Sequence, residues 1–145
     1  MSFSSSAIRW LLALLSAALL GQSFPGQAAS GSATDGVQAT RGSDGVQRAD
    51  IVGGDYFFQP ARIVVRVGVP VELSVRVEAG IVPHSFVLEA PAAGISIDED
   101  LGEEPKVLAF VPRLAGSYPF HCRNKLLFFK SHRERGMEGV LEVVE

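Results

Sequence analysis

The sequence predicts an all-β domain built as a sandwich of seven or eight strands. Three features carry this prediction. Short β-branched and aromatic runs follow one another, separated by Gly and Pro. The clearest run, 71–77, alternates apolar and polar residues as a half-buried strand does. No long segment repeats apolar residues at the helical period. Many short strands with turn residues between them are typical of antiparallel sandwiches and barrels.

The expected strands begin with an aromatic and β-branched run and end at turn residues. The first strand covers 50–58, and the pair Gly53-Gly54 inside it suggests a bulge. Gln59-Pro60 ends this strand. The later strands are expected at 62–67, 71–77, 84–89, 95–97, 105–111, 118–122 and 139–144.

The first 29 residues have the pattern of a secretory signal peptide. Arg9 is followed by the apolar run 10–20, and small residues at 26–30 offer cleavage sites. The apolar run is shorter than the roughly 20 residues that span a bilayer. An uncleaved membrane anchor is the alternative. We therefore expect a periplasmic or secreted protein without a transmembrane span in the mature chain.

The next segment, 30–50, is rich in Gly, Ser, Ala and Thr and has few apolar residues. Such a segment buries too little apolar surface to offset its ordering entropy. We expect a flexible linker at 30–50 and a single folded domain at 51–145. The formal net charge of −3 is ordinary for a soluble protein and argues against bulk nucleic-acid binding.

The segment from Cys122 to Met137 gathers donor atoms that soft metals prefer. It contains the only Cys, one imidazole at His132, and the only Met after the first residue. His84 lies upstream in an apolar run. Taken singly, each has an ordinary structural interpretation: an inert buried Cys, a core or loop His, a packed Met. Together, two His, one Cys and a weak axial Met are the donors of a blue-copper site, whereas a thioether is a poor zinc ligand.

Four motifs carry a family resemblance over residues 51–145. They are Phe-Gln-Pro at 58–60, Pro-His-Ser-Phe at 83–86, Gly-Ser-Tyr-Pro-Phe-His-Cys at 116–122 and Gly-Met-Glu-Gly-Val-Leu at 136–141. With these motifs the domain resembles the cupredoxins, the small blue-copper proteins. The resemblance implies a Greek-key β-sandwich with one type 1 copper ion at one end. It also implies that the copper ligands are His84, Cys122, His132 and Met137.

Two positions depart from the common cupredoxin pattern. Nine residues separate Cys122 from His132, which resembles the long ligand loop of copper nitrite reductases more than that of plastocyanin or azurin. Ser85 follows the first His where many members have an Asn that bridges the ligand loops. A Ser hydroxyl reaches less far, so we expect the bridge to be built differently.

Two further features near the expected ligands have open interpretations. His121 should face away from Cys122, because adjacent strand residues point to opposite faces. It is a surface His, or, in a symmetric oligomer, a ligand of a second copper. The apolar insert 126–129 packs beneath the metal with at least two of its residues, or it forms a docking patch. Basic residues around the insert could steer an acidic partner or simply be solvated.

The resemblance implies a one-electron carrier cycling between Cu(II) and Cu(I), not an enzyme. The alternatives are a copper-binding or copper-delivery protein and, less favoured, a subunit-like domain of a copper oxidoreductase. A carrier implies redox partner proteins such as a cytochrome or a membrane oxidoreductase, with no nucleic acid. We expect the carrier to be a monomer.

Overall fold

The structure is a computed structural model that describes residues 36–145. The expected signal peptide, 1–29, lies outside the described residues. The elements, in chain order, are β1 (Val37–Gln38), β2 (Thr40–Arg41), β3 (Gln47–Gly54), β4 (Phe57–Gln59), β5 (Arg62–Arg66), β6 (Val71–Val77), β7 (His84–Ala90), η1 (Pro91–Ala93), β8 (Ile95–Leu101), β9 (Lys106–Phe110), β10 (Gly116–His121), η2 (Arg133–Arg135) and β11 (Glu138–Val144).

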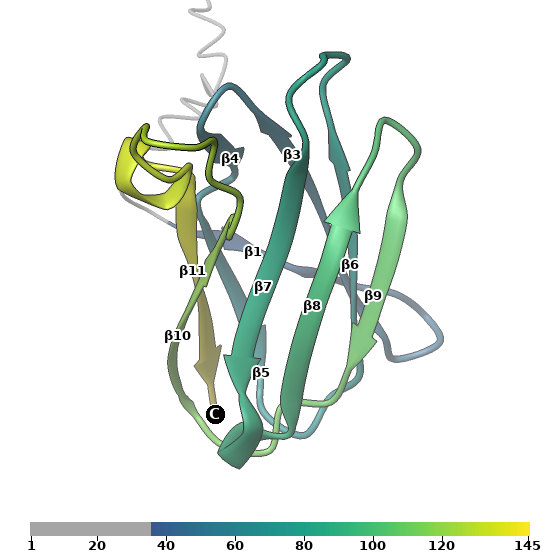
Figure 1. Cartoon of the computed structure of the whole chain (residues 1–145). Coiled ribbons are helices and arrows are strands. Elements are labelled where there is room, and N and C mark those ends of the chain that lie inside the picture. The colour runs from purple at the N-terminus through teal and green to yellow at the C-terminus, as the bar shows by residue number, and fades with distance from the viewer. Residues whose placement is uncertain (1–35) are drawn as a thin grey trace, which may run out of the picture. The chain divides into compact units, whose positions relative to one another are not determined.

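The strands form two sheets packed face to face, which confirms the predicted β-sandwich (Figure 1). One sheet has the order β1-β5-β11-β10-β7-β8, and the other has the order β2-β3-β6-β9 with β4 paired to β3. The pairings β1–β5, β5–β11 and β3–β6 are parallel, so the sheets are mixed rather than purely antiparallel. Within residues 36–145 no helix is long and apolar enough to cross a membrane.

The expected flexible linker at 30–50 is wrong for its described part. Strand β1 pairs with β5, β2 pairs with β3, and the first half of β3 pairs with β6 through Gln47–Asp50. Backbone hydrogen bonds along existing strands order this polar segment, although its side chains bury little apolar surface. Ala39 and Gln47 are nevertheless buried. The folded domain therefore begins well before residue 51.

The expected bulge at Gly53-Gly54 is also absent. Both glycines pair in regular register with Phe58 and Phe57 in the β3–β4 hairpin. At Gly53 a Cβ would lie 3.2 Å from the Met137 methyl and 3.1 Å from a methyl of Val77. Glycine at this position leaves the space that the Met137 thioether occupies.

The core between the sheets is continuous with the residues of the candidate site. Three aromatic rings, those of Phe58, Phe86 and Phe120, pack with centroids 4.9–5.6 Å apart. Cys122 and Met137 belong to the same buried cluster. Each large apolar side chain buried here contributes about 1.5–3 kcal/mol. The candidate ligands Cys122 and Met137 are thus part of the same core as these rings.

We predict that Gln47→Met destabilises the domain, because Gln47 is part of the fold and not of a linker. Its side chain accepts a hydrogen bond from Arg66 N–H at 2.7 Å and donates one to Arg66 O at 3.2 Å. Leaving these backbone groups unpaired should cost about 1–3 kcal/mol in the free energy of unfolding. Chemical denaturation measures this loss. Gln38→Met, at an exposed position, is the control. Equally small losses of unfolding free energy in the two variants would contradict the assignment of Gln47 to the fold.

Candidate metal centre

The four candidate ligands come from two regions of the chain that the sandwich brings to one end. His84 is the first residue of β7. Cys122 directly follows β10, whose His121 pairs with Val87 of β7. His132 precedes η2, and Met137 lies between η2 and β11. The strands β11, β10 and β7 are neighbours in one sheet, and β10 is antiparallel to the other two. The end of β10 therefore lies beside the starts of β7 and β11.

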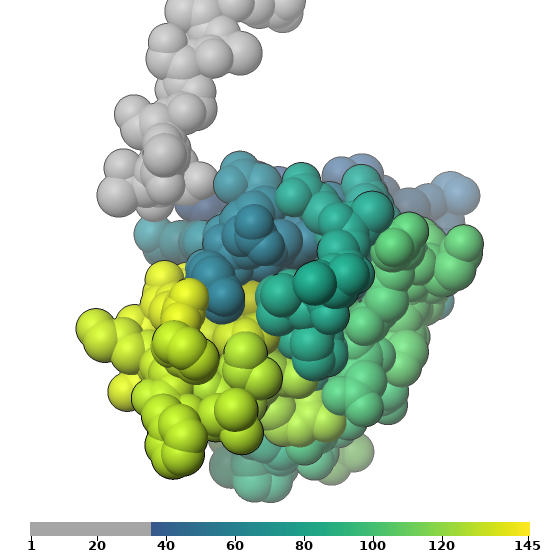
Figure 2. All heavy atoms as spheres, turned by 45° about the horizontal axis from the view of Figure 1, so that its top comes forward, coloured from purple at the N-terminus to yellow at the C-terminus, as the bar shows by residue number. Residues whose placement is uncertain are grey.

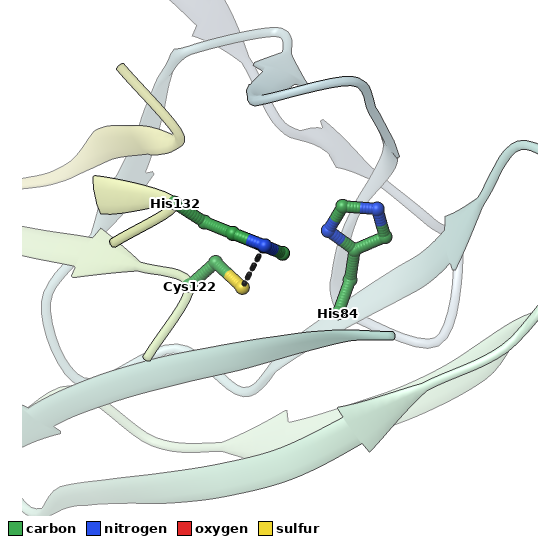
Figure 3. Close-up of side chains that lie close together, drawn as sticks. All are labelled: His84, Cys122 and His132. Atoms are coloured by element: carbon green, nitrogen blue, oxygen red, sulfur yellow. Dashed lines mark hydrogen bonds between the residues drawn. The ribbon is translucent and has the colours of Figure 1, made fainter. Parts of the chain in front are cut away.

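The donor atoms of the candidate ligands face one another. Cys122 Sγ lies 3.4 Å from His132 Nδ1, and His84 Nδ1 lies 3.1 Å from Met137 Sδ. One ligand atom from each of His84, Cys122 and His132 lies within 4.8 Å of the others. Figure 3 shows the two imidazole rings and the thiol converging from different elements. The structure thus brings together all four residues that the sequence singled out.

Backbone hydrogen bonds hold the ligand loop, 122–137, in a closed conformation. Cys122 N–H donates to Met137 O at 3.0 Å, and Met137 N–H donates to His132 O at 2.9 Å. His132 N–H donates to Asn124 O at 2.9 Å. Gly136 has a φ of 105°, a left-handed conformation that Gly adopts without strain and that turns the chain from η2 toward Met137. Three of the four ligands are therefore tied to one another through the main chain.

Ser85 joins the two regions that supply the ligands. Its backbone N–H donates to Cys122 Sγ at 3.4 Å. Its hydroxyl accepts a hydrogen bond from Arg123 N–H at 3.0 Å and lies 3.6 Å from the same sulfur. The short Ser side chain reaches because Ser85 is fully buried against the start of the loop. Because Ser85 stands where an Asn is common, we expected a different bridge between the ligand regions. The structure shows that the Ser85 side chain itself forms this bridge.

All four candidate ligands are buried, with 0–6% of each residue exposed. Burial lowers the pKa of His84, and the neighbouring His132 lowers it further. Burial and the nearby Arg135 guanidinium lower the pKa of His132. Both rings are consequently neutral, and able to donate a lone pair, over a wider pH range than a solvated His.

The arrangement fits one soft metal ion. Imidazole and thiolate bonds to a metal such as zinc are about 2.0–2.3 Å long, so two ligands of one tetrahedral ion lie about 3.3–3.8 Å apart. The 3.4 Å between Cys122 Sγ and His132 Nδ1 falls within this range, and the ligand atoms of His84, Cys122 and His132 all lie within 4.8 Å of one another. The donors are sulfur and imidazole, with no carboxylate in the cluster. This chemistry suits copper better than hard cations such as calcium or magnesium.

His121 does not join the metal cluster. It pairs with Glu138 and Val87 within the sheet and is half-buried, while the cluster among the described residues comprises His84, Cys122 and His132. Burial lowers the pKa of His121, and Arg133 lowers it further. Its position agrees with the expectation that it faces away from Cys122.

The apolar insert 126–129 does not pack beneath the metal. All four residues are exposed, from 57% for Phe129 to 100% for Phe128. The buried cluster that contains Cys122 and Met137 is built instead from residues such as Phe86 and Phe120. The expectation that at least two of its residues are buried is therefore wrong, and the insert forms an exposed apolar patch.

Comparison with known proteins supports this architecture. No protein-family model and no curated protein matches the sequence. Auracyanin A, a blue copper protein from Chloroflexus aurantiacus, is 19% identical and superposes with a TM-score of 0.51 over 69% of this chain and 100% of its own. The chain has the fold of the cupredoxins.

Two other solved structures share the cupredoxin fold of this chain. The metal-binding domain of the Streptococcus pneumoniae D39 Cu(I)-exporting P-type ATPase CopA, solved with Cu(I), is 25% identical with a TM-score of 0.59. The match covers 77% of this chain and 98% of that domain. A copper-binding protein solved in the apo form is 21% identical, with a TM-score of 0.54 over 78% of this chain and 100% of its own.

We predict that the metal-free cupredoxin domain loses stability as the pH falls below about 6.5. The pKa values of His84 and His132 lie below their ordinary value of 6.5 in the folded state, so the unfolded chain binds more protons in this range. Denaturation between about pH 7.5 and about pH 5 measures the effect. The double variant His84→Gln/His132→Gln should show a shallower decline. An equally steep decline in that variant would assign the effect to other groups.

We also predict that Ser85→Ala weakens the domain and lowers the reduction potential of its copper-loaded form. The change removes the acceptor of Arg123 N–H, at a cost of about 1 kcal/mol in unfolding free energy. It also removes a hydroxyl near Cys122 Sγ, and hydrogen bonding around this sulfur tunes the potential. The exposed Ser96→Ala is the control for voltammetry and denaturation. An unchanged potential would show that the hydroxyl only braces the loop.

Proposed function

We propose that this protein is an exported type 1 copper protein that carries single electrons. His84, Cys122, His132 and Met137 would hold the ion. Copper bound there would supply one-electron chemistry between Cu(II) and Cu(I). The observation that carries the proposal is the burial of all four donors, two sulfurs and two imidazoles, in one packed cluster. A periplasmic or secreted location and redox partner proteins are part of the same proposal.

The protein's own contribution is to keep the ligands in place. Cys122 and Met137 pack in the core, and backbone hydrogen bonds link Cys122 to Met137 and Met137 to His132. A site held in this way rearranges little when its charge changes. Four protein donors also leave no open position for a substrate, unlike a catalytic metal site.

His132 provides the route by which electrons would leave. His132 is 4% exposed and lies beneath a shallow hollow lined by Tyr56, Val82, Leu126, Phe129, Lys130 and Arg135. Tyr56 covers it edge-on, with ring centroids 5.0 Å apart. His132 therefore separates the buried sulfur ligands from the surface by a single side chain. A partner seated over the hollow would come closest to the metal through this ring.

The second candidate function is copper binding and delivery, in which the metal is cargo. The likeness to the metal-binding domain of a Cu(I)-exporting ATPase favours this candidate. The burial of the ligands opposes it, because handing over an ion requires its ligands to be reached by those of the acceptor. The two functions differ in whether the ion stays bound through repeated oxidation and reduction.

We predict that the thiolate and the thioether contribute separately to the copper-loaded protein. Cys122→Ser should abolish the intense visible absorption, because that band is charge transfer from the Cys sulfur. Met137→Leu should keep the colour and raise the reduction potential, because an alkyl group no longer donates to Cu(II). Absorption spectra and voltammetry measure both. If Met137→Leu left spectrum and potential unchanged, Met137 would be a core residue only.

We predict that copper remains bound through many redox cycles. The protein, loaded with one equivalent of copper, is reduced and reoxidised repeatedly with a Cu(I) chelator in the solution. An electron carrier retains its copper and its colour from cycle to cycle, since the ligands are buried. Gly53→Ala is the matched variant. Its added methyl group presses on Met137 and should loosen the site, so this variant should lose copper sooner. Loss of copper from the unaltered protein in the first cycles would favour delivery.

A further inference from the structure

The end of the domain that carries the metal centre also carries two exposed apolar loops. One is the insert Leu126–Phe129, and the other is the segment 79–83 between β6 and β7. Phe128 and Ile81 are each 100% exposed, and Leu127 is 75% exposed. A hollow lined by Ile81, Val82 and Pro83 on one side and by Asn124, Lys125, Leu126 and His132 on the other joins the two loops. They form one patch, which we call the apolar rim.

The apolar rim stands out from the domain rather than forming a cavity. Figure 2 brings this end forward and shows the yellow-green ligand loop as a projection next to the teal loop that precedes β7. The insert is a tight turn in which Phe129 N–H donates to Leu126 O at 3.0 Å. Leu127 lies at the tip with a φ of 44°, a conformation in which Gly or Asn is usual. The sequence thus places a large apolar side chain where neither exposure nor backbone conformation favours one.

Cations flank the insert in sequence and in space. Lys125 and Lys130 stand directly before and after it and are exposed. None of the ion pairs within residues 36–145 includes either of them. The nearby Glu134 carboxylate accepts hydrogen bonds from the backbone and side chain of Ser131. These hydrogen bonds, and to a lesser degree Lys125 and Lys130, lower the pKa of the Glu134 carboxyl, but neither ammonium group is held in an ion pair with a described residue.

From this arrangement we infer that the apolar rim docks on an anionic lipid surface. Apolar side chains at the tips of two turns enter the acyl boundary, while the two Lys remain at the level of the headgroups. One backbone hydrogen bond, from Phe129 N–H to Leu126 O, closes the turn that would enter this boundary. A fluid bilayer accepts two separate projections at once, whereas a protein partner would need a matching pair of cavities. This inference does not rest on the proposed electron transfer, and because the rim shares Val82 and Leu126 with the hollow above His132, a lipid-bound domain would offer less of that hollow to a partner.

The acidic groups at this end set the orientation of docking. Asp55 and Glu78 line a different hollow, which shares Ile81 and Val82 with the apolar rim but includes no residue of the insert. Glu103 and Glu104 lie in the β8–β9 connection, which β7 separates from the ligand loop (Figure 1). Repulsion from anionic headgroups would tilt these acidic groups away from the bilayer. The insert and its two Lys would then face the lipid.

Sedimentation of the full chain with vesicles tests the inference. Vesicles of phosphatidylcholine with phosphatidylglycerol should bind the protein, and vesicles of phosphatidylcholine alone should bind it far less. Leu127→Ser/Phe128→Ser should weaken binding at least about tenfold, because the transferred apolar area is lost. Lys125→Gln/Lys130→Gln should weaken it by roughly fivefold for each Lys removed, and added salt should act in the same direction.

Matched variants at the opposite end of the sandwich serve as controls. Val111→Ser/Leu114→Ser removes two exposed apolar side chains, and Arg41→Gln/Arg113→Gln removes two exposed cations. These changes should leave vesicle binding within about twofold. All variants share residues 1–29, so differences between them report on the apolar rim alone. Equal binding to both kinds of vesicle, or equal loss in rim and control variants, would overturn the inference.

A probe within the insert gives a second, local measurement. Trp10 is the only Trp of the chain, so Trp10→Phe/Phe128→Trp places a single indole at the tip of the turn. Its fluorescence in the metal-free protein should shift to shorter wavelength with anionic vesicles, and brominated lipids should quench it. An unshifted, unquenched indole would overturn lipid docking. Protection of that indole by an acidic protein instead of by vesicles would assign the apolar rim to a protein partner.

Discussion

The closure of the ligand loop by main-chain hydrogen bonds is the constraint on which the metal centre depends. The bond from Cys122 N–H to Met137 O extends the β10–β11 pairing by one step beyond the sheet. This hydrogen bond brings the Cys122 thiol and the Met137 thioether together, whatever conformation the residues between them adopt. The loop between them can therefore be long, and can expose an apolar turn, without disturbing the ligands. Only His84 must arrive from elsewhere, and β7 supplies it as the strand next to β10.

Burial gives this centre both its stability and its chemistry. The ligands continue the core that Phe86 and Phe120 begin, so the metal would sit on packed side chains rather than in a flexible loop. Within residues 36–145 no buried side-chain nitrogen or oxygen lacks a hydrogen-bond partner. Burial also keeps the two imidazoles neutral by lowering their pKa values. Because the buried core holds the ligands, the surface above His132 is free to differ from that of other domains of this fold. In this chain that surface carries the exposed insert 126–129.

The sequence predicted the sandwich well where apolar alternation or a chemical motif marks it. The runs at 62–67 and 71–77 fall on β5 and β6 within a residue, and the four candidate ligands converge as the resemblance implied. The sequence misled at 36–50, where the strands are ordered by backbone pairing and no composition signal reports it. It also misled at the insert, because an apolar run looks the same whether the core has space for it or not. The sequence did not predict the parallel pairings either, because they join strands far apart in the chain, such as β3 with β6 and β5 with β11.

X-ray absorption at the copper edge, measured on the protein in both oxidation states, tests the central claim most directly. The claim is that four buried side chains, fixed by the sandwich and the closed loop, form one preassembled copper site. It predicts a single copper with one short bond to sulfur and two to imidazole nitrogen, and nearly the same shell after reduction. A spectrum without the short sulfur bond, or one whose ligand number changes on reduction, would contradict it.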